Sequence, residues 1–113
     1  MTDTVSVMFG QGNGTFTTPP QTTNTNSKGP TALINVDLNG DGFPDLITAN
    51  QAATNLSVMR GSATGAFAAG TLYTVGNSPR FLVSGDLNGD AQPDLISSNA
   101  QSGNISVLIS QCN

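Results

Sequence analysis

The sequence lacks most of the side chains that enzymes use for catalysis. Its 113 residues contain no histidine, no glutamate and no tryptophan, and the single cysteine, Cys112, stands beside the C-terminus. General acid–base and nucleophilic reactions usually need such groups in a pocket. The composition therefore predicts a protein that is not an enzyme. Cys112 has no second cysteine to pair with in the chain, so we expect a free thiol, with a link between chains as the alternative.

Charged residues are also scarce, at 9% of the chain, and only three are basic: Lys28, Arg60 and Arg80. Nucleic-acid binding relies on clustered Lys and Arg side chains that contact phosphates, so no nucleic-acid partner is expected. The chain has no apolar run long enough to span a membrane, so no membrane span is expected. The N-terminus lacks the charged and apolar regions of a secretion signal.

Small and polar residues make up much of the chain, chiefly Thr, Ser, Asn, Gln and Gly. A helical bundle needs Leu, Glu, Lys and Ala instead, whereas this composition suits strands joined by many turns. No segment has helical periodicity. The sequence therefore predicts a single all-β domain.

Six of the seven acidic residues, all of them Asp, fall in two loops that begin 49 residues apart. Loop 1 spans residues 37–47 (DLNGDGFPDLI) and loop 2 spans residues 86–96 (DLNGDAQPDLI). Side chains that carry oxygen stand at positions 1, 3, 5 and 9 of each loop. They are Asp37, Asn39, Asp41 and Asp45 in loop 1, and Asp86, Asn88, Asp90 and Asp94 in loop 2.

Three carboxylates in one short loop repel one another, by roughly 3 kcal/mol for a pair about 5 Å apart at an effective dielectric near 20. A hard cation such as Ca²⁺ relieves this repulsion and takes about six to eight oxygen ligands. We therefore predict one Ca²⁺ at each loop, and two ions bring the formal charge from −4 to about neutral. The alternative is a plain turn, built from Asn, Asp and Gly for backbone reasons alone.

Both loops open like the loop of a helix-flanked EF-hand, which requires a bidentate Glu at position 12. Thr48 and Ser97 occupy that position here, and β-prone Leu-Ile follows position 9, so an EF-hand is excluded. Loop 2 differs from loop 1 at position 6, where Ala91 replaces Gly42. If position 6 needs a left-handed backbone, the alanine Cβ costs about 1 kcal/mol. We therefore expect weaker metal binding at loop 2.

The repeat extends beyond the loops to a strand that occurs three times: residues 5–10 (VSVMFG), 56–61 (LSVMRG) and 105–110 (ISVLIS). A repeat period of about 49 residues indicates a repeat architecture. Three copies of one strand in 113 residues therefore indicate that more than two units are present.

The complete unit is expected to contain four strands, at 31–37, 45–49, 56–60 and about 67–74. The first strand and its counterpart at 80–86 each contain a short apolar run, at 32–34 and 81–83, and are expected to be buried on both faces. The third alternates and is expected to be half buried, and the fourth is a more polar outer strand. A four-stranded antiparallel unit of this length, with its most buried strand first, is typical of a β-propeller blade.

The two loops, the SVMFGxGxGxF stretch of the first copy, and the proline before the first strand (Pro30 and Pro79) together resemble the FG-GAP or VCBS repeat family. This family is known from integrin α-chain propellers, bacterial surface proteins and some fungal lectins. The resemblance covers nearly the whole chain, although Arg60 stands where the first copy has the Phe of its Phe-Gly pair. It implies that Ca²⁺ is held by the side chains at positions 1, 3, 5 and 9 and by the carbonyl at position 7, which is Phe43 in loop 1 and Gln92 in loop 2.

Propellers close with about four to eight blades, whereas 113 residues hold about 2.3 units. The expected division is strands three and four of a blade in 1–26, a complete blade in 27–76, and strands one to three of the next blade in 77–113. Open sheet edges favour association. Either the sequence is cut from a longer protein, or several copies build the ring together; we expect a ring closed by homo-oligomerisation, most simply a cyclic trimer.

A non-catalytic, calcium-stabilised scaffold for binding or adhesion is the leading functional hypothesis. The alternative is a multivalent lectin with sugar pockets between blades. Its polar candidates are Asn50, Gln51, Asn55, Asn77, Asn99 and Gln101, while Tyr73 is expected to be a surface residue of the outer strand. The ligand is accordingly a glycan or a protein. Calcium loops that fill at millimolar free ion indicate an extracellular or cell-surface location.

Overall fold

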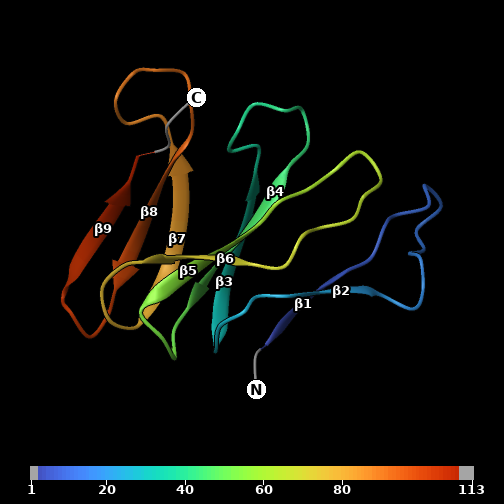
Figure 1. Ribbon diagram of the computed structural model, residues 1–113. Helices are drawn as coiled ribbons and strands as arrows, with labels where there is room; N and C mark the ends of the chain where they lie inside the picture. The colour runs from blue at the N-terminus through green and yellow to red at the C-terminus, as the bar shows by residue number, and fades with distance from the viewer. Residues whose placement is uncertain (1–2, 110–113) are drawn as a thin grey trace.

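The computed structural model describes residues 3–109, so Cys112 lies outside it. In this range the chain forms nine strands in three sheets (Figure 1). The first sheet contains β1 (Thr4–Val7) and β2 (Gln21–Asn24). The second contains, in order, β3 (Pro30–Val36), β4 (Asp45–Asn50), β5 (Asn55–Met59) and β6 (Thr71–Thr74). The third contains β7 (Pro79–Gly85), β8 (Asp94–Asn99) and β9 (Asn104–Leu108).

The all-β prediction is confirmed for the described residues, which contain no helix. Every pairing between these strands is antiparallel and joins neighbours in the sequence. The three sheets lie beside one another in Figure 1, and residues 3–109 do not close into a ring. Among these residues, no helix is long and apolar enough to cross a membrane.

Burial along the strands differs from the prediction. The first strand of each unit was expected to be the most buried, yet β3 and β7 carry many exposed positions, whereas β4 and β5 are buried nearly throughout. This expectation is wrong because only one face of each strand is covered: Leu33 on β3 and Phe81 on β7 are exposed, whereas the opposite faces pack in the apolar cluster. The half-buried status expected for residues 56–60 is wrong because both faces of β5 are covered, with Leu56 in the apolar cluster and Ser57 bonded to Thr25. The outer strand β6 is exposed throughout, and Tyr73 lies on it.

The segment that follows β2 is joined to the second sheet by buried and partly buried hydrogen bonds, which we call the polar seam. Ser57 Oγ donates to the backbone carbonyl of Thr25, and Ser27 Oγ donates to Asn55 Oδ1, both at 2.7 Å. Asn50 Nδ2 donates to Asn55 Oδ1 at 2.9 Å and to Ser57 Oγ at 2.8 Å. A polar network whose members are satisfied in this way fixes one alignment of the two sheets.

The second and third sheets are joined instead by apolar packing. In the second sheet, β4 and β5 pair so that Ile47 faces Val58 and Ala49 faces Leu56, which places all four side chains on one face. That face packs against the third sheet in a single buried cluster. Its buried members are Ile47, Ala49, Leu56, Val58, Leu82 and Leu95. The two faces of the second sheet therefore differ. One makes polar contacts through the polar seam, and the other makes apolar contacts with the third sheet.

Candidate metal centre

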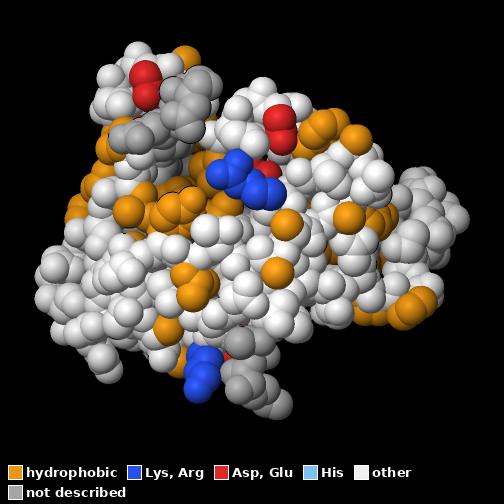
Figure 2. Space-filling model, viewed as in Figure 1, with side chains coloured by type: hydrophobic (Ala, Val, Ile, Leu, Met, Phe, Trp, Pro, Cys, Tyr) orange, Lys and Arg blue, Asp and Glu red, His pale blue; other side chains and the backbone are white. Residues whose placement is uncertain are grey.

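Loop 1 connects β3 to β4 and loop 2 connects β7 to β8, so they occupy equivalent corners of their sheets. Val36 pairs with Asp45 and Gly85 pairs with Asp94, which brings the two ends of each loop together. Both loops project from the same end of the molecule in Figure 1, and Figure 2 shows acidic side chains over each. The strand pairing thus positions the first and last acidic residues of each loop.

The position-1 aspartate of each loop is surrounded by backbone N–H groups. Asp37 Oδ1 accepts from Gly40 (2.9 Å) and Asp41 (3.3 Å), and its Oδ2 accepts from Gly42 (2.9 Å). Asp86 accepts the same three bonds in loop 2, from Gly89, Asp90 and Ala91, at 2.9, 3.2 and 2.9 Å.

These bonds favour the charged form of the carboxylate. The position-6 N–H makes the largest contribution, and together the donors hold the pKa of Asp37 and of Asp86 below the usual value of 3.8, against a smaller opposing effect of desolvation. Both side chains are therefore ionised at neutral pH, as a metal ligand must be.

Positions 3, 5 and 7 are tied to one another in the same way. Asp41 Oδ1 accepts from the N–H of Phe43, and Asp90 Oδ1 accepts from that of Gln92, both at 2.9 Å. Asn39 Oδ1 accepts from the N–H of Asp41 at 3.3 Å. The position-7 residues, Phe43 and Gln92, are thus anchored by their N–H groups to the aspartate at position 5. Asn88 is the corresponding exposed residue at position 3 of loop 2.

The position-9 aspartate is buried and has a second role that sequence reasoning missed. Asp45 Oδ2 accepts from the N–H of Leu38 (3.0 Å), and its Oδ1 accepts from the N–H of Gly61 (2.9 Å), just beyond β5. Asp45 therefore links the start of loop 1 to the end of β5. In loop 2, Asp94 is also buried, and its Oδ2 accepts from the N–H of Leu87 at 2.9 Å. This role alone is a reason for an Asp to recur at position 9.

Gly61 completes this arrangement, and sequence analysis placed it in the repeat but not in the site. A Cβ at Gly61 would overlap the backbone carbonyl of Pro44, so only glycine allows the chain to approach loop 1 this closely. Its recurrence at Gly10 was the available signal. The third copy has Ser110 at this position, which lies outside the described residues.

The carboxylates of loop 2 come together in one cluster. One oxygen each from Asp86, Asp90 and Asp94 lie within 4.8 Å of one another, and among residues 3–109 this is the single group of three Asp, Glu, His or Cys side chains so close together. Ca²⁺ binds oxygen at about 2.3–2.6 Å, so two of its ligands stand no more than about 5 Å apart. The spacing and the oxygen-only donor set therefore fit a calcium ion.

Position 6 adopts the left-handed backbone in both loops, with φ of 87° at Gly42 and 67° at Ala91. The condition behind the expected difference between the loops is therefore met. Ala91 still donates the same N–H bond as Gly42, so the loop geometry is kept at the cost of strain, about 1 kcal/mol. The weaker metal binding expected at loop 2 stays a prediction. The close carboxylate cluster lies in this same loop, which carries the strained Ala91.

Three of the polar residues considered for sugar binding are in strands rather than loops. Asn50 and Asn99 are buried, in β4 and β8, and Asn55 spends its side-chain oxygen on the polar seam. The expectation that these three residues lie in loops is wrong, because strand pairing places them in β4, β5 and β8. Gln51, Asn77 and Gln101 lie together around a pocket between the second and third sheets.

The fold and the loops define an all-β repeat protein with two aspartate-rich turns in equivalent places. The FG-GAP-like repeat family matches the chain twice, over residues 2–48 and 37–97, and the chain belongs to that family. Comparison with curated proteins and with solved structures finds no significant match.

Proposed function

We propose that this protein is a calcium-stabilised, non-catalytic scaffold that presents its surface to a binding partner. The supporting observation is the clustering of Asp86, Asp90 and Asp94 around a space that suits Ca²⁺. Loop 1 repeats the hydrogen-bond pattern of loop 2 at position 1 and position 5, which extends the proposal to two sites per chain. Membership of a repeat family with β-rich units agrees with a scaffold role.

In each site, the ion takes oxygens from the side chains at positions 1, 3, 5 and 9 and from the carbonyl at position 7. The bound ion neutralises the repulsion between carboxylates, and it does so only in the folded loop. Its binding free energy therefore adds to the free energy of unfolding. The residues that hold the ion are those that already orient the loop, so the metal reinforces the β3–β4 and β7–β8 hairpins.

The sheets are the blades of a propeller in this proposal, with residues 1–26, 27–76 and 77–113 forming a half blade, a full blade and three strands of a third. Several copies, most simply three, complete the ring. Calcium sites of this kind fill in calcium-rich surroundings, so the protein acts outside the cell or on its surface.

The test is thermal unfolding in Ca²⁺ and in excess EGTA. We expect Ca²⁺ to raise Tm, since a ligand at 100 times its Kd adds about 2.7 kcal/mol to the free energy of unfolding. The double variant Asp37→Asn, Asp86→Asn removes the position-1 charge from both loops and is expected to abolish the rise.

The control is Asp3→Asn, which removes the one aspartate outside the loops. Asp3 accepts a hydrogen bond from the N–H of Gly29, so this variant lowers Tm but keeps the increase with Ca²⁺. Identical melting curves of the unaltered protein in Ca²⁺ and EGTA would overturn the proposal.

A second candidate function is carbohydrate binding at the pocket between the second and third sheets. The β4–β5 turn, the β6–β7 connection and the β8–β9 turn line it, and they contribute the amides of Gln51, Asn77 and Gln101. Such side chains donate and accept hydrogen bonds, as sugar hydroxyls require. Saturable binding on a glycan array that Gln51→Ala weakens, and that the exposed Gln11→Ala leaves unchanged, would support it. An array that shows no saturable binding would contradict the lectin function and leave the scaffold proposal unaffected.

A further inference from the structure

The dipeptide Asn-Gly, which can deamidate without an enzyme, occurs three times in this chain: at residues 13–14, 39–40 and 88–89. In this reaction the backbone nitrogen of the glycine attacks the side-chain carbonyl carbon of the asparagine. Glycine has no Cβ to obstruct the attack, and it leaves the backbone free to rotate into position. Because the three pairs have the same two residues, the fold around each pair decides which of them reacts.

Two of the pairs lie in the aspartate-rich loops, where the attacking nitrogen is already bonded. The N–H of Gly40 donates to Asp37 Oδ1, and the N–H of Gly89 donates to Asp86 Oδ1, both at 2.9 Å. Hydrogen bonds to a carboxylate are among the stronger ones in proteins. The nitrogen must also lose its proton to attack, and a neighbouring carboxylate disfavours the negative charge that this creates. Loops 1 and 2 therefore protect their asparagines.

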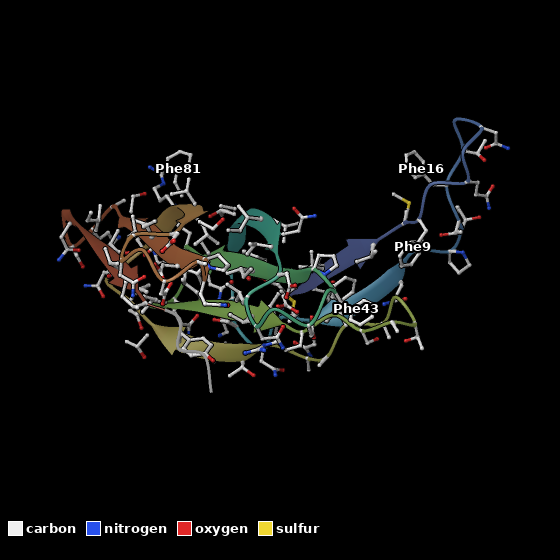
Figure 3. The ribbon with its side chains drawn as sticks, turned by 90° about the horizontal axis from the view of Figure 1, so that it is seen from above. Phe9, Phe16, Phe43 and Phe81 are labelled. Atoms are coloured by element: carbon white, nitrogen blue, oxygen red, sulfur yellow. The ribbon has the colours of Figure 1, made fainter. Side chains whose placement is uncertain are left out.

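The third pair lies in the loop that joins β1 to β2. In Figure 3 this loop, which carries Phe16, extends away from the three sheets. Asn13 and Gly14 are exposed, and a Cβ at Gly14 would meet no atom within 4 Å. Within residues 3–109, the N–H of Gly14 has no acceptor, whereas the equivalent Gly65 of the second unit donates to the carbonyl of Ser62 at 3.1 Å. The nitrogen of Gly14 is therefore available for the attack.

The side chain of Asn13 also has donors where the reaction needs them. Its Oδ1 accepts from the N–H of Thr15 at 3.1 Å and from the Thr15 hydroxyl at 2.6 Å. This oxygen gains negative charge as the attack proceeds, and donors that already point at it stabilise that charge. Asn39 Oδ1 accepts a single, longer bond, from the N–H of Asp41 at 3.3 Å. The donors therefore favour reaction at Asn13 over Asn39.

We propose that Asn13 is a site of spontaneous deamidation in the folded protein, and that the fold protects Asn39 and Asn88. The Gly14 nitrogen bonds to Cγ of Asn13, and its proton passes through water to the side-chain nitrogen, which leaves as ammonia. Water then adds to either carbonyl of the resulting succinimide ring and opens it to aspartate or isoaspartate. The β1–β2 loop gains one negative charge, and isoaspartate lengthens its backbone by one methylene. This inference is independent of the calcium and scaffold proposals.

The test is a timed incubation of the folded protein at mildly alkaline pH, in EGTA so that no metal contributes. Trypsin cuts after each of the three basic residues and separates the pairs into the peptides 1–28, 29–60 and 81–113. Mass spectrometry measures the conversion of each peptide, and fragmentation locates the altered residue. We expect Asn13 to convert about tenfold faster than Asn39 or Asn88, which corresponds to a barrier lower by about 1.4 kcal/mol.

Incubation in urea is the control for sequence, because the three pairs are then unfolded and should convert at similar rates. Asn13→Gln is the control for position, since the longer side chain disfavours the five-membered ring, and it should abolish the conversion in peptide 1–28. Equal rates at the three pairs in the folded protein, or a preference for Asn13 that persists unchanged in urea, would overturn the inference.

The protection in loop 1 is tested separately by Asp37→Ala, with circular dichroism to check that the variant folds. This change releases the N–H of Gly40 and should speed the conversion of Asn39. Asn88 is the matched control in the same sample, because Asp86 still bonds to Gly89. An unchanged rate at Asn39 would contradict the protective role of the position-1 carboxylate.

Discussion

The two units of this protein share a sequence pattern but differ in how well their structure supports it. In the first unit, loop 1 has glycine at its left-handed position and the apolar face of β4 and β5 is covered. In the second unit, Ala91 occupies the left-handed position and the equivalent apolar face is bare. The comparison separates what a unit encodes by itself from what its neighbours supply.

The spacing of the carboxylates does not follow this difference between the two units. Loop 2 gathers Asp86, Asp90 and Asp94 within 4.8 Å, although its backbone is the more strained. Local hydrogen bonds, which are nearly the same in both loops, therefore keep the carboxylates in place even where position 6 is unfavourable. The following experiments test how far the two units are equivalent.

The largest effect is expected from removing the buried carboxylate of the first unit. Asp45→Ala leaves the N–H groups of Leu38 and Gly61 without their acceptor, which costs about 3 kcal/mol of unfolding free energy. Urea unfolding in EGTA measures this cost apart from any metal. Asp41→Asn, at an exposed position of the same loop, is the control and should change stability little under these conditions. Equal stabilities of Asp45→Ala and the unaltered protein in EGTA would contradict the structural role of Asp45.

Gly61→Ala is expected to cost about 2 kcal/mol, because its Cβ overlaps the Pro44 carbonyl and the chain must move apart. Gly10→Ala is the matched control at the equivalent place in the first copy, where an added Cβ meets only the edge of the Phe16 ring at 3.9 Å. Chemical unfolding of the two variants gives the difference. If both lose the same stability, the close approach at loop 1 is not the cause.

Exchanging the position-6 residues should move the two loops in opposite directions. Ala91→Gly relieves strain in loop 2, and Gly42→Ala introduces it into loop 1, where the added Cβ meets no neighbouring atom within 4 Å. Each change is worth about 1 kcal/mol. Calorimetric Ca²⁺ titration should show tighter binding at loop 2 for Ala91→Gly and weaker binding at loop 1 for Gly42→Ala. Unchanged affinities in both variants would show that backbone strain at position 6 does not affect metal binding.

The smallest effect is the expected loss of stability at acid pH. The N–H donors lower the pKa of Asp37 and Asp86 below 3.8 in the folded protein. Their contribution to stability is therefore present above about pH 3.8 and is lost as pH falls through the lower, folded pKa. Carboxyl NMR titration should give both residues low and similar pKa values, and Ala91→Gly should leave that of Asp86 low. A pKa of Asp86 well above that of Asp37 would show that the loops differ at position 1.

Much of this arrangement is readable from the sequence because it is local. The aspartates at positions 1, 5 and 9, the turn glycines and the antiparallel hairpins follow from short-range patterns, and the family match agrees with them. Burial was harder to predict from the sequence, because it depends on which face of a sheet another sheet covers. Leu33 reads as core in the sequence, and it is exposed because its face of β3 is uncovered, whereas Ala32 and Ile34 on the other face pack against the apolar cluster.

The buried roles of Asp45 and Asn50 could not be read from spacing. Asp45 bonds to Gly61, 16 residues away, and Asn50 bonds across to the adjacent strand. Such contacts depend on how the β4–β5 hairpin folds back over the loop. A pattern that repeats at a fixed offset shows that a residue is needed, but it does not distinguish a ligand from a hydrogen-bond acceptor.

The two oxygens of Asp45 have one further consequence. An ion that draws on either oxygen competes with an amide that is already bonded to it, and one of those amides belongs to Gly61, beyond the end of β5. Filling loop 1 should therefore shift the amide resonance of a residue that never touches the ion. That resonance offers a remote reporter for the occupancy of loop 1.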